Sequence, residues 1–175
     1  MSISAHLTPE PERRLWLILE NMRRSVEWAD MKIGALTAFA AGQLAFFRIL
    51  TPSNPLGFAA LAALTAALPL GVFAFAPLTR IPQWLSFLEP KRDKPTTDDC
   101  LISVEDLSKY SHGELIFRLD KYLGGGITAT PYYEDVVGQI VERAKVAARK
   151  QRLFSIACLV VGIGQLGLLA QLVWH

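Results

Sequence analysis

The sequence predicts an all-α membrane protein, in which three transmembrane helices carry a small cytoplasmic helical bundle built on membrane-continuous stalk helices. Charged residues make up only 19% of the 175 residues, below the roughly 25% of an average soluble chain. The deficit is local, because residues 49–79 and 153–174 contain no charged side chain. Each of these runs exceeds the ~18 apolar residues that mark a membrane-spanning helix. A soluble globular enzyme, a disordered chain and a nucleic-acid-binding module are therefore disfavoured.

This pattern divides the chain into four segments. Residues 1–32 are predicted to form a cytoplasmic N-terminal stalk helix, and residues 33–78 a hairpin of transmembrane helices 1 and 2. Residues 79–152 are predicted to form a cytoplasmic helical sensor segment with a second stalk, and residues 153–175 the third transmembrane helix.

The first predicted span covers residues 31–50, with its uninterrupted apolar part at Ile33 to Phe47, and the second covers residues 56–78. The polar and proline-rich link between them suits a tight hairpin. The third predicted span covers residues 153–174. At 1.5 Å per residue, a helix of about 22 residues reaches ~33 Å, enough for the ~30 Å hydrocarbon core of a bilayer.

Small residues recur at helical spacing along all three predicted spans, and such stripes let helix backbones approach closely. They are Gly34, Ala38 and Gly42 in the first, Ala59, Ala63, Ala67 and Gly71 in the second, and Gly162, Gly164 and Gly167 in the third. Gln43, Gln165 and Gln171 are expected to hydrogen-bond between helices. The stripes are interpreted as packing within one subunit, with self-association or a pore lining as the alternatives.

The basic residues predict an orientation. Of the 18 lysines and arginines, five lie in residues 1–32, 12 lie in residues 80–152, and the remaining one is Arg48. The positive-inside rule therefore places the N-terminus and residues 79–152 in the cytoplasm. Three spans then leave the C-terminus on the opposite side of the membrane.

The first stalk is predicted to start at Thr8 and Pro9, which combine a capping side chain with a proline at the first helical position. Apolar residues then recur with the alternating four-three spacing of a packed seam. They are Leu15, Leu19, Met22, Val26, Ala29 and Ile33. Because this seam reaches the first span, the helix is expected to run unbroken into the membrane.

A second stalk has the same design. Thr130 and Pro131 open it, and the seam consists of Tyr133, Val137, Ile140, Ala144 and Ala147 ahead of the third span. Both stalks run towards the membrane, so they can pack in parallel.

Two capping-box patterns predict two helices between the second span and the second stalk. Ser103-x-x-Asp106 predicts a short helix near residues 104–110, and Ser111-x-x-Glu114 predicts a longer one near residues 112–123. The glycines at 124–126 are interpreted as a helix stop, because the Lys-Ser/Thr of a phosphate-binding loop does not come after them.

No catalytic constellation is visible, so the chain is predicted not to be an enzyme and to hold neither a metal nor a cofactor. The three histidines share no metal-ligand spacing. Cys100 lies in a polar stretch and Cys158 in an apolar run, so both are expected to be reduced. The adjacent acids at 98–99 and 105–106 are interpreted as solvated charges.

Basic and aromatic residues of the sensor segment are the best candidates for binding a small anion. They are Arg118, Lys121, Tyr132, Tyr133, Arg143 and Lys145, with Tyr110 and Tyr122 as further aromatic candidates. These residue types suit a nucleotide, because aromatic rings stack on bases and guanidinium groups bind phosphate. Tyrosines packed between helices are the alternative. The arginines of the first stalk, such as Arg13 and Arg24, have acidic residues three or four positions away and are expected to be paired locally.

The juxtamembrane sequence WADMKIG, residues 28–34, resembles the A-D-x-K-small signature at the head of the first span in the transmembrane effector proteins of bacterial Pycsar anti-phage systems. Further matches are LISVEDL at residues 101–107, YEDV at 133–136, and Gln139–Ile140, Ala144–Lys145 and Lys150. The likeness covers residues 15–170. It departs from the family at residues 101–107, where an aromatic-rich version is missing, and at 108–130, which has no clear counterpart.

This resemblance implies an effector of antiviral defence. A partner cyclase would make cyclic UMP or cyclic CMP on infection, the cytoplasmic part would sense it, and impairment of the membrane would end in abortive infection. The implied partners are the lipid bilayer, the cyclic nucleotide as activating ligand and further copies of the chain in a homo-oligomer, with no nucleic acid polymer. The implied location is the cell inner membrane, with the C-terminus in the periplasm.

The motif also transfers a role to Asp30 and Lys32, which lie where the first stalk meets the bilayer. They are expected to pair with Arg149, Lys150 or Glu142 of the second stalk, and so to couple stalk movement to the spans. A plain interfacial anchor is the alternative for Lys32. For the whole chain, the alternative function is an accessory membrane subunit whose cytoplasmic helices dock a soluble protein partner.

Overall fold

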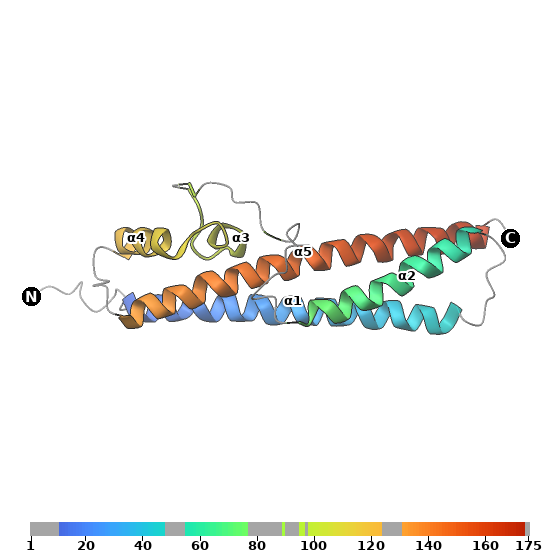
Figure 1. The fold of residues 1–175 in the computed structure, drawn as a ribbon, viewed down its shortest axis with the longest axis horizontal. Helices are drawn as coiled ribbons and strands as arrows, with labels where there is room; N and C mark the ends of the chain where they lie inside the picture. The colour runs from blue at the N-terminus through green and yellow to red at the C-terminus, as the bar shows by residue number, and fades with distance from the viewer. Residues whose placement is uncertain are drawn as a thin grey trace, which may run out of the picture. The chain divides into compact units, whose positions relative to one another are not determined.

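The computed structural model describes residues 11–47, 55–76, 89, 95–96, 98–123 and 131–173. The secondary structure of these residues is α-helical without a β-strand, as the sequence predicts (Figure 1). The helices are α1 (Pro11–Phe47), α2 (Pro55–Ala74), α3 (Val104–Leu107), α4 (His112–Leu123) and α5 (Pro131–Val173).

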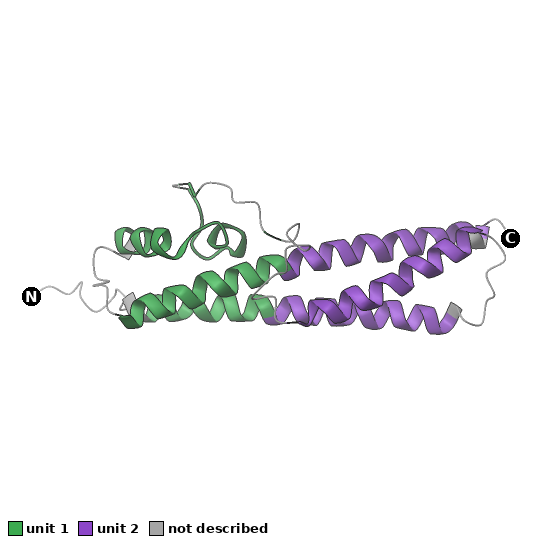
Figure 2. Ribbon diagram, in the orientation of Figure 1, with its two compact units in different colours: residues 1–26, 81–149 green, residues 27–80, 150–175 purple. Residues whose placement is uncertain are grey.

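The chain divides into two compact units (Figure 2). Unit 1 comprises Met1–Val26 and Ile81–Arg149, and unit 2 comprises Glu27–Arg80 and Lys150–His175. Helices α1 and α5 each contribute residues to both units.

Helices α1 and α5 are uninterrupted over 37 and 43 residues. The helix of each predicted stalk therefore continues without a break into the apolar segment beyond it, as expected. Helix α5 begins at Pro131, where the fixed φ of proline suits the first helical position and its missing N–H leaves no bond unmade. The predicted start at Thr8 and Pro9 lies outside the described residues.

The buried faces of α1 and α5 have the predicted four-three spacing. The buried seam residues are Leu15, Leu19, Met22, Ala29 and Ile33 in α1, and Val137, Ile140, Ala144 and Ala147 in α5. Val26 and Tyr133 are half-buried. The seam prediction is therefore confirmed for nine of its 11 residues.

In unit 1, four helical segments share one hydrophobic core. Its most deeply buried side chains are Leu15 and Met22 of α1, Leu107 of α3, Leu115 and Leu119 of α4, and Val137 and Ile140 of α5. Each such side chain contributes roughly 1.5–3 kcal/mol by leaving water. Unit 1 is thus a small helical bundle in which α3 and α4 pack on the first parts of α1 and α5.

In unit 2, helices α1, α2 and α5 share a second core that is rich in small residues. It consists of Ala40 of α1, Ala60, Leu64 and Ala67 of α2, and Val161 and Leu168 of α5. Gly164 and Gly167 of α5 lie against α2, where an added Cβ would be 3.0 Å from a carbon of Leu64 or Ala60. At these positions the small residues pack helices within one chain.

Among the described residues, two helices are long and apolar enough to cross a membrane, namely α2 and the Pro131–Ala170 part of α5. The first predicted span, residues 31–50, lies in α1 as far as Phe47, and residues 48–50 lie outside the described part. Its 15 uncharged residues from 33 to 47 are fewer than the ~18 of a spanning helix, because any longer described stretch includes Lys32. Two of the three predicted spans are therefore candidate membrane helices, and the first stays a prediction.

Two predicted helix ends are wrong. Helix α2 stops at Ala74 and ends in a turn at Phe75 and Ala76, whereas the sequence predicts a second span as far as residue 78. Pro77 explains this end, because a proline disfavours helical geometry in the residue before it. Helix α3 stops at Leu107 rather than at residue 110.

Of the two expected capping boxes, one is present. The backbone N–H of Ser111 donates to Glu114 Oε2 at 2.9 Å, and the N–H of Glu114 faces Ser111 Oγ at 3.4 Å. The Ser103 side chain makes no cap hydrogen bond, so the box predicted there is wrong. Its expected partner Asp106 instead accepts a hydrogen bond from the N–H of Cys100 at 3.0 Å.

Candidate functional site

In unit 2, a lysine of α5 is paired with an aspartate of α1. The Lys150 ammonium donates a hydrogen bond to Asp30 Oδ1. The Lys150 side chain is 6% exposed and that of Asp30 is 33% exposed. A lysine is almost never buried to this degree unless it is paired, and removal of the carboxylate would leave an uncompensated buried charge.

The remaining residues predicted for coupling have other surroundings. In unit 1, Arg149 is almost buried, and its Nη2 lies 3.8 Å from Glu89 Oε1. In unit 2, Lys32 is exposed. The carboxylate beside Lys150 is thus Asp30, and the one beside Arg149 is Glu89. The coupling role of all these residues stays a prediction.

The four basic residues predicted to bind a ligand do not point to one common face. Arg118 and Lys121 lie three positions apart on α4, so they share a face of that helix. Arg143 is exposed and Lys145 is half-buried on α5. Side chains two positions apart on a helix point away from each other, so Arg143 and Lys145 do not form a joint phosphate site.

The two predicted tyrosines contact each other at the start of α5, with ring centroids 5.7 Å apart in an edge-to-face arrangement. Tyr133 packs against the core of unit 1. Tyr132 is 48% exposed, and its hydroxyl accepts a hydrogen bond from Nε1 of Trp16, itself 49% exposed, at 3.2 Å. Tyr133 is therefore a packing residue, whereas Tyr132 lies at the surface beside a second aromatic ring.

Neither Trp16 nor Arg13 is among the residues that the sequence predicts to bind a ligand. Arg13 is exposed and precedes Trp16 by three positions, so it lies on the same face of α1. The signal for Trp16 is a large aromatic residue beside, rather than in, the buried seam. Its partner Tyr132 lies 116 positions away, which no local pattern reveals. Arg13, Trp16 and Tyr132 are called the aromatic patch below.

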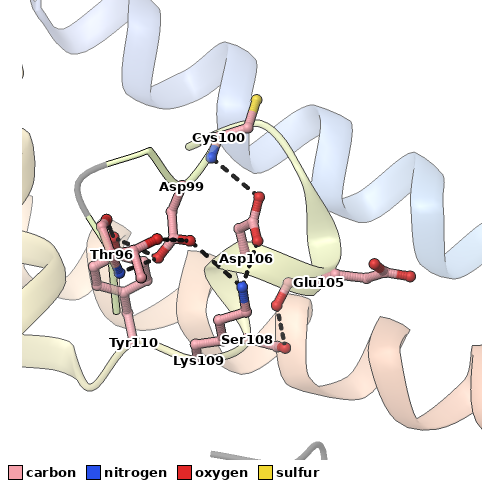
Figure 3. Close-up of polar contacts among 8 residues, drawn as sticks. All are labelled: Thr96, Asp99, Cys100, Glu105, Asp106, Ser108, Lys109 and Tyr110. Carbon is pink, nitrogen blue, oxygen red and sulfur yellow. Dashed lines mark hydrogen bonds and ion pairs between the residues drawn. The ribbon is translucent and has the colours of Figure 1, made fainter. Parts of the chain in front are cut away.

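A polar network holds the segment before α3 in unit 1 (Figure 3). The Asp99 carboxylate accepts hydrogen bonds from the Thr96 N–H at 2.8 Å, the Thr96 hydroxyl at 2.7 Å and the Tyr110 hydroxyl at 3.1 Å. Lys109 Nζ lies 2.7 Å from Asp106 Oδ1 and 3.4 Å from Asp99 Oδ1. The Asp99 side chain is only 4% exposed, so interpreting this acid as a solvated charge was wrong.

The pKa values of both acids in the network are lowered, and that of its phenol is raised. The Thr96 N–H and hydroxyl lower the pKa of Asp99 to about 2. The hydrogen bond from Lys109, together with the weaker effect of the Cys100 N–H, lowers the pKa of Asp106. Burial raises the pKa of the Tyr110 phenol. The two acids of the network are therefore ionised at neutral pH and serve to fix this segment, and Tyr110 is buried in it rather than available for stacking.

The described residues contain no group of three His, Cys, Asp or Glu side chains that could hold a metal ion. Cys100 and Cys158 are both free thiols.

Comparison with known proteins identifies the family of the chain. No curated protein and no solved structure gives a significant match. A family profile described as the Pycsar effector protein domain matches residues 14–174, which is almost the whole chain and confirms the resemblance seen in the sequence. That family is not known as one of enzymes. The chain therefore belongs to the Pycsar effector protein family, which acts in cyclic-nucleotide anti-phage defence.

Proposed function

We propose that the chain is a membrane effector that binds cyclic UMP or cyclic CMP from a partner cyclase and then impairs the cell inner membrane. Family membership supports a role in cyclic-nucleotide defence, and α2 and α5 support a membrane location. In this proposal unit 1 is the cytoplasmic sensor and unit 2 the membrane part. The positive-inside rule supports this orientation.

The observation that carries the proposal is that α1 and α5 each belong to both units. A helix with an intact hydrogen-bonded backbone transmits a shift or rotation along its length. Ligand binding to the first part of either helix would therefore reach the apolar part. The ligand shifts this equilibrium only if it binds one arrangement of the helices more tightly than the other.

The aromatic patch is the proposed place for the ligand. Trp16 and Tyr132 each leave about half of their surface open, so a pyrimidine ring can stack on either ring. Stacking of a base on an aromatic side chain contributes about 1–3 kcal/mol. The guanidinium of Arg13 is suited to the cyclic phosphate, since its fork of donors matches phosphate oxygens.

We propose that the Asp30–Lys150 pair stabilises the resting arrangement of α1 and α5. It connects α1 to α5 within unit 2, three positions before the apolar residues Ile33 and Leu153 begin their segments. Rearrangement of the two helices would have to break or re-form this pair. The spans would then be free to adopt a leaky arrangement.

Nucleotide binding by the purified full-length protein in detergent tests the sensing step. We expect saturable binding of cyclic UMP or cyclic CMP, and an affinity about 5- to 150-fold weaker for Trp16→Ala, which corresponds to the loss of about 1–3 kcal/mol of stacking. Phe117→Ala is the matched control, because Phe117 is an exposed aromatic residue of unit 1 outside the patch and its loss should leave binding unchanged.

Absence of binding by the wild-type protein to either cyclic pyrimidine would overturn the proposal. Co-purification of a stoichiometric protein partner, unaffected by nucleotides, would instead support the accessory-subunit alternative.

A further inference from the structure

Two glutamine side chains of unit 2 place a buried polar atom beside its apolar core. Gln43 of α1 lies three positions after Ala40, and Gln165 of α5 lies three positions before Leu168, so each shares a helix face with a core residue. Gln43 Oε1 and Gln165 Nε2 are buried, and neither atom has a hydrogen-bond partner in the described part of the chain. Because folded proteins pair nearly all their buried polar groups, each exception calls for an explanation.

Hydroxyl groups of the same unit are satisfied within their own helices. Thr37 of α1, Thr65 of α2 and Ser155 of α5 each donate a hydrogen bond to the carbonyl four positions earlier, at 2.8, 2.8 and 3.0 Å. A short hydroxyl side chain reaches its own backbone in this way. The resting packing thus satisfies these three hydroxyls and leaves the two glutamine atoms without a partner.

The two glutamines lie at the same level of unit 2. Asp30 of α1 contacts Lys150 of α5, and both helices run from this contact into the shared core. Gln43 comes 13 positions after Asp30, and Gln165 comes 15 positions after Lys150. The difference of two positions is about 3 Å at the helical rise.

This level is also the middle of the apolar segments. Gln43 comes 10 positions after the start of the uncharged run 33–47, and Gln165 comes 12 positions after the start of the run 153–174. These separations are about 15 and 18 Å, or about half of the ~30 Å hydrocarbon core. In the membrane placement of the proposed function, on which this inference rests, both amides lie near the centre of the bilayer. Lipid tails offer no hydrogen-bond partner there.

We propose that Gln43 and Gln165 line a water-filled path between the helices of unit 2 when the protein leaks. Polar side chains within a membrane characteristically face such paths. Water that enters as the helices separate donates a hydrogen bond to Gln43 Oε1 and accepts one from Gln165 Nε2. The leaking arrangement therefore gains hydrogen bonds that the resting one lacks, and the species that cross are water and the small solutes dissolved in it.

Thiol labelling in proteoliposomes tests the path while both glutamines stay in place. In a background in which Cys100 and Cys158 are replaced by serine and alanine, Val161→Cys is treated with a charged, membrane-impermeant methanethiosulfonate. Val161 is only 4% exposed and lies one turn before Gln165, on the same face of α5. Ile163→Cys is the matched control, because Ile163 is two positions away and 57% exposed, so it faces lipid in the proposed placement.

Cyclic UMP and cyclic CMP are the triggers in this assay. The reagent needs a thiolate in water. We therefore expect a cyclic pyrimidine to make labelling of Val161→Cys at least about tenfold faster, and to leave that of Ile163→Cys slow throughout.

Removal of the amides gives a second readout that needs no cysteine. Gln43→Leu and Gln165→Leu should each slow nucleotide-triggered dye release by about fivefold or more, the lower end of what an unsatisfied buried polar atom costs, with nucleotide binding unchanged. Thr65→Val is the control, because it removes a polar group that is already bonded within its helix, and it should release dye as the wild type does.

The outcomes separate this inference from the proposed function. If the wild type releases dye on nucleotide addition, but labelling of Val161→Cys is not faster with nucleotide or both leucine variants release normally, the path is wrong and the proposed function stands. A wild type that releases no dye with either cyclic pyrimidine would overturn both.

Discussion

The ammonium of Lys150 on α5 is buried against the carboxylate of Asp30 on α1, 120 positions earlier in the chain. This contact joins two helices of unit 2 that also share an apolar core. The attraction between the two charges is largely offset by the cost of taking them out of water. Loss of one partner is costly, because the other charge then stays in a site with little water.

Asp30→Ala should therefore destabilise the protein by about 3 kcal/mol, the lower end of the range for breaking a buried pair, because Asp30 is one third exposed. Chemical unfolding in detergent micelles measures this change. Asp30→Ala combined with Lys150→Met should be more stable than Asp30→Ala alone, since no buried charge is left without its partner. A double variant as unstable as the single one would show that the pair does not account for the effect.

The contact between Gly71 of α2 and Thr37 of α1 predicts a second stability change. A Cβ added at Gly71 would lie 2.0 Å from Thr37 Oγ1, and forcing a methyl group into a packed site costs about 1–3 kcal/mol. Gly71→Ala should therefore lower the unfolding temperature in detergent. Gly162→Ala, at a helical glycine with nothing within 4 Å, is the control and should be neutral or slightly stabilising. Equal effects of the two substitutions would contradict the close approach of α1 and α2.

Two glutamines of unit 2 predict a change of the opposite sign. Gln43 Oε1 and Gln165 Nε2 are buried and have no hydrogen-bond partner in the described part of the chain, so the expected interhelical hydrogen bonds of these two atoms are missing. An unsatisfied buried polar atom costs about 1–3 kcal/mol. Gln165→Leu should thus raise the stability of the resting protein, while Gln139→Leu, outside the buried face of α5, should have little effect. Destabilisation by Gln165→Leu would show that its amide is satisfied.

The Asp99 network predicts how stability depends on pH. The pKa of Asp99 is lowered from 3.8 to about 2 in the folded chain, so its contribution is fully present above about pH 4 and is lost as the pH falls towards 2. The pKa of Asp106 is lowered as well, which adds to the loss in acid. Asp99→Asn should reduce the stability at pH 7 and flatten its decline in acid, as measured by urea unfolding at a series of pH values. Asp98→Asn, at the exposed neighbouring acid, is the control, and an equal effect of both would contradict the network.

Features that repeat along one helix could be predicted from the sequence. The four-three spacing located the buried faces of α1 and α5, because burial has the helical period wherever one face meets a core. The Ser111 box located the start of α4, because both partners lie within one turn. The same pattern at Ser103 failed, since Asp106 and Tyr110 take part in a network with Asp99 that reaches outside that turn.

Contacts between distant segments could not be predicted in this way. Trp16 and Tyr132 are both visible as aromatic residues, but only the packing of α1 against α5 brings them together. The motif at Asp30 suggested a basic partner on the second stalk and left two candidates, Arg149 and Lys150. Burial of Lys150 beside Asp30 selects one contact in the structure, which no spacing rule could have done.

Dye release from proteoliposomes tests the central claim, that a cyclic pyrimidine nucleotide turns the resting protein into a membrane leak. Vesicles that contain the purified full-length protein and an entrapped fluorescent dye are mixed with cyclic UMP, cyclic CMP, cyclic AMP or linear UMP. The account predicts release with one or both cyclic pyrimidines only, strongly reduced by Trp16→Ala and kept by Phe117→Ala. Release that is independent of nucleotide, or no release with any of them, would contradict it.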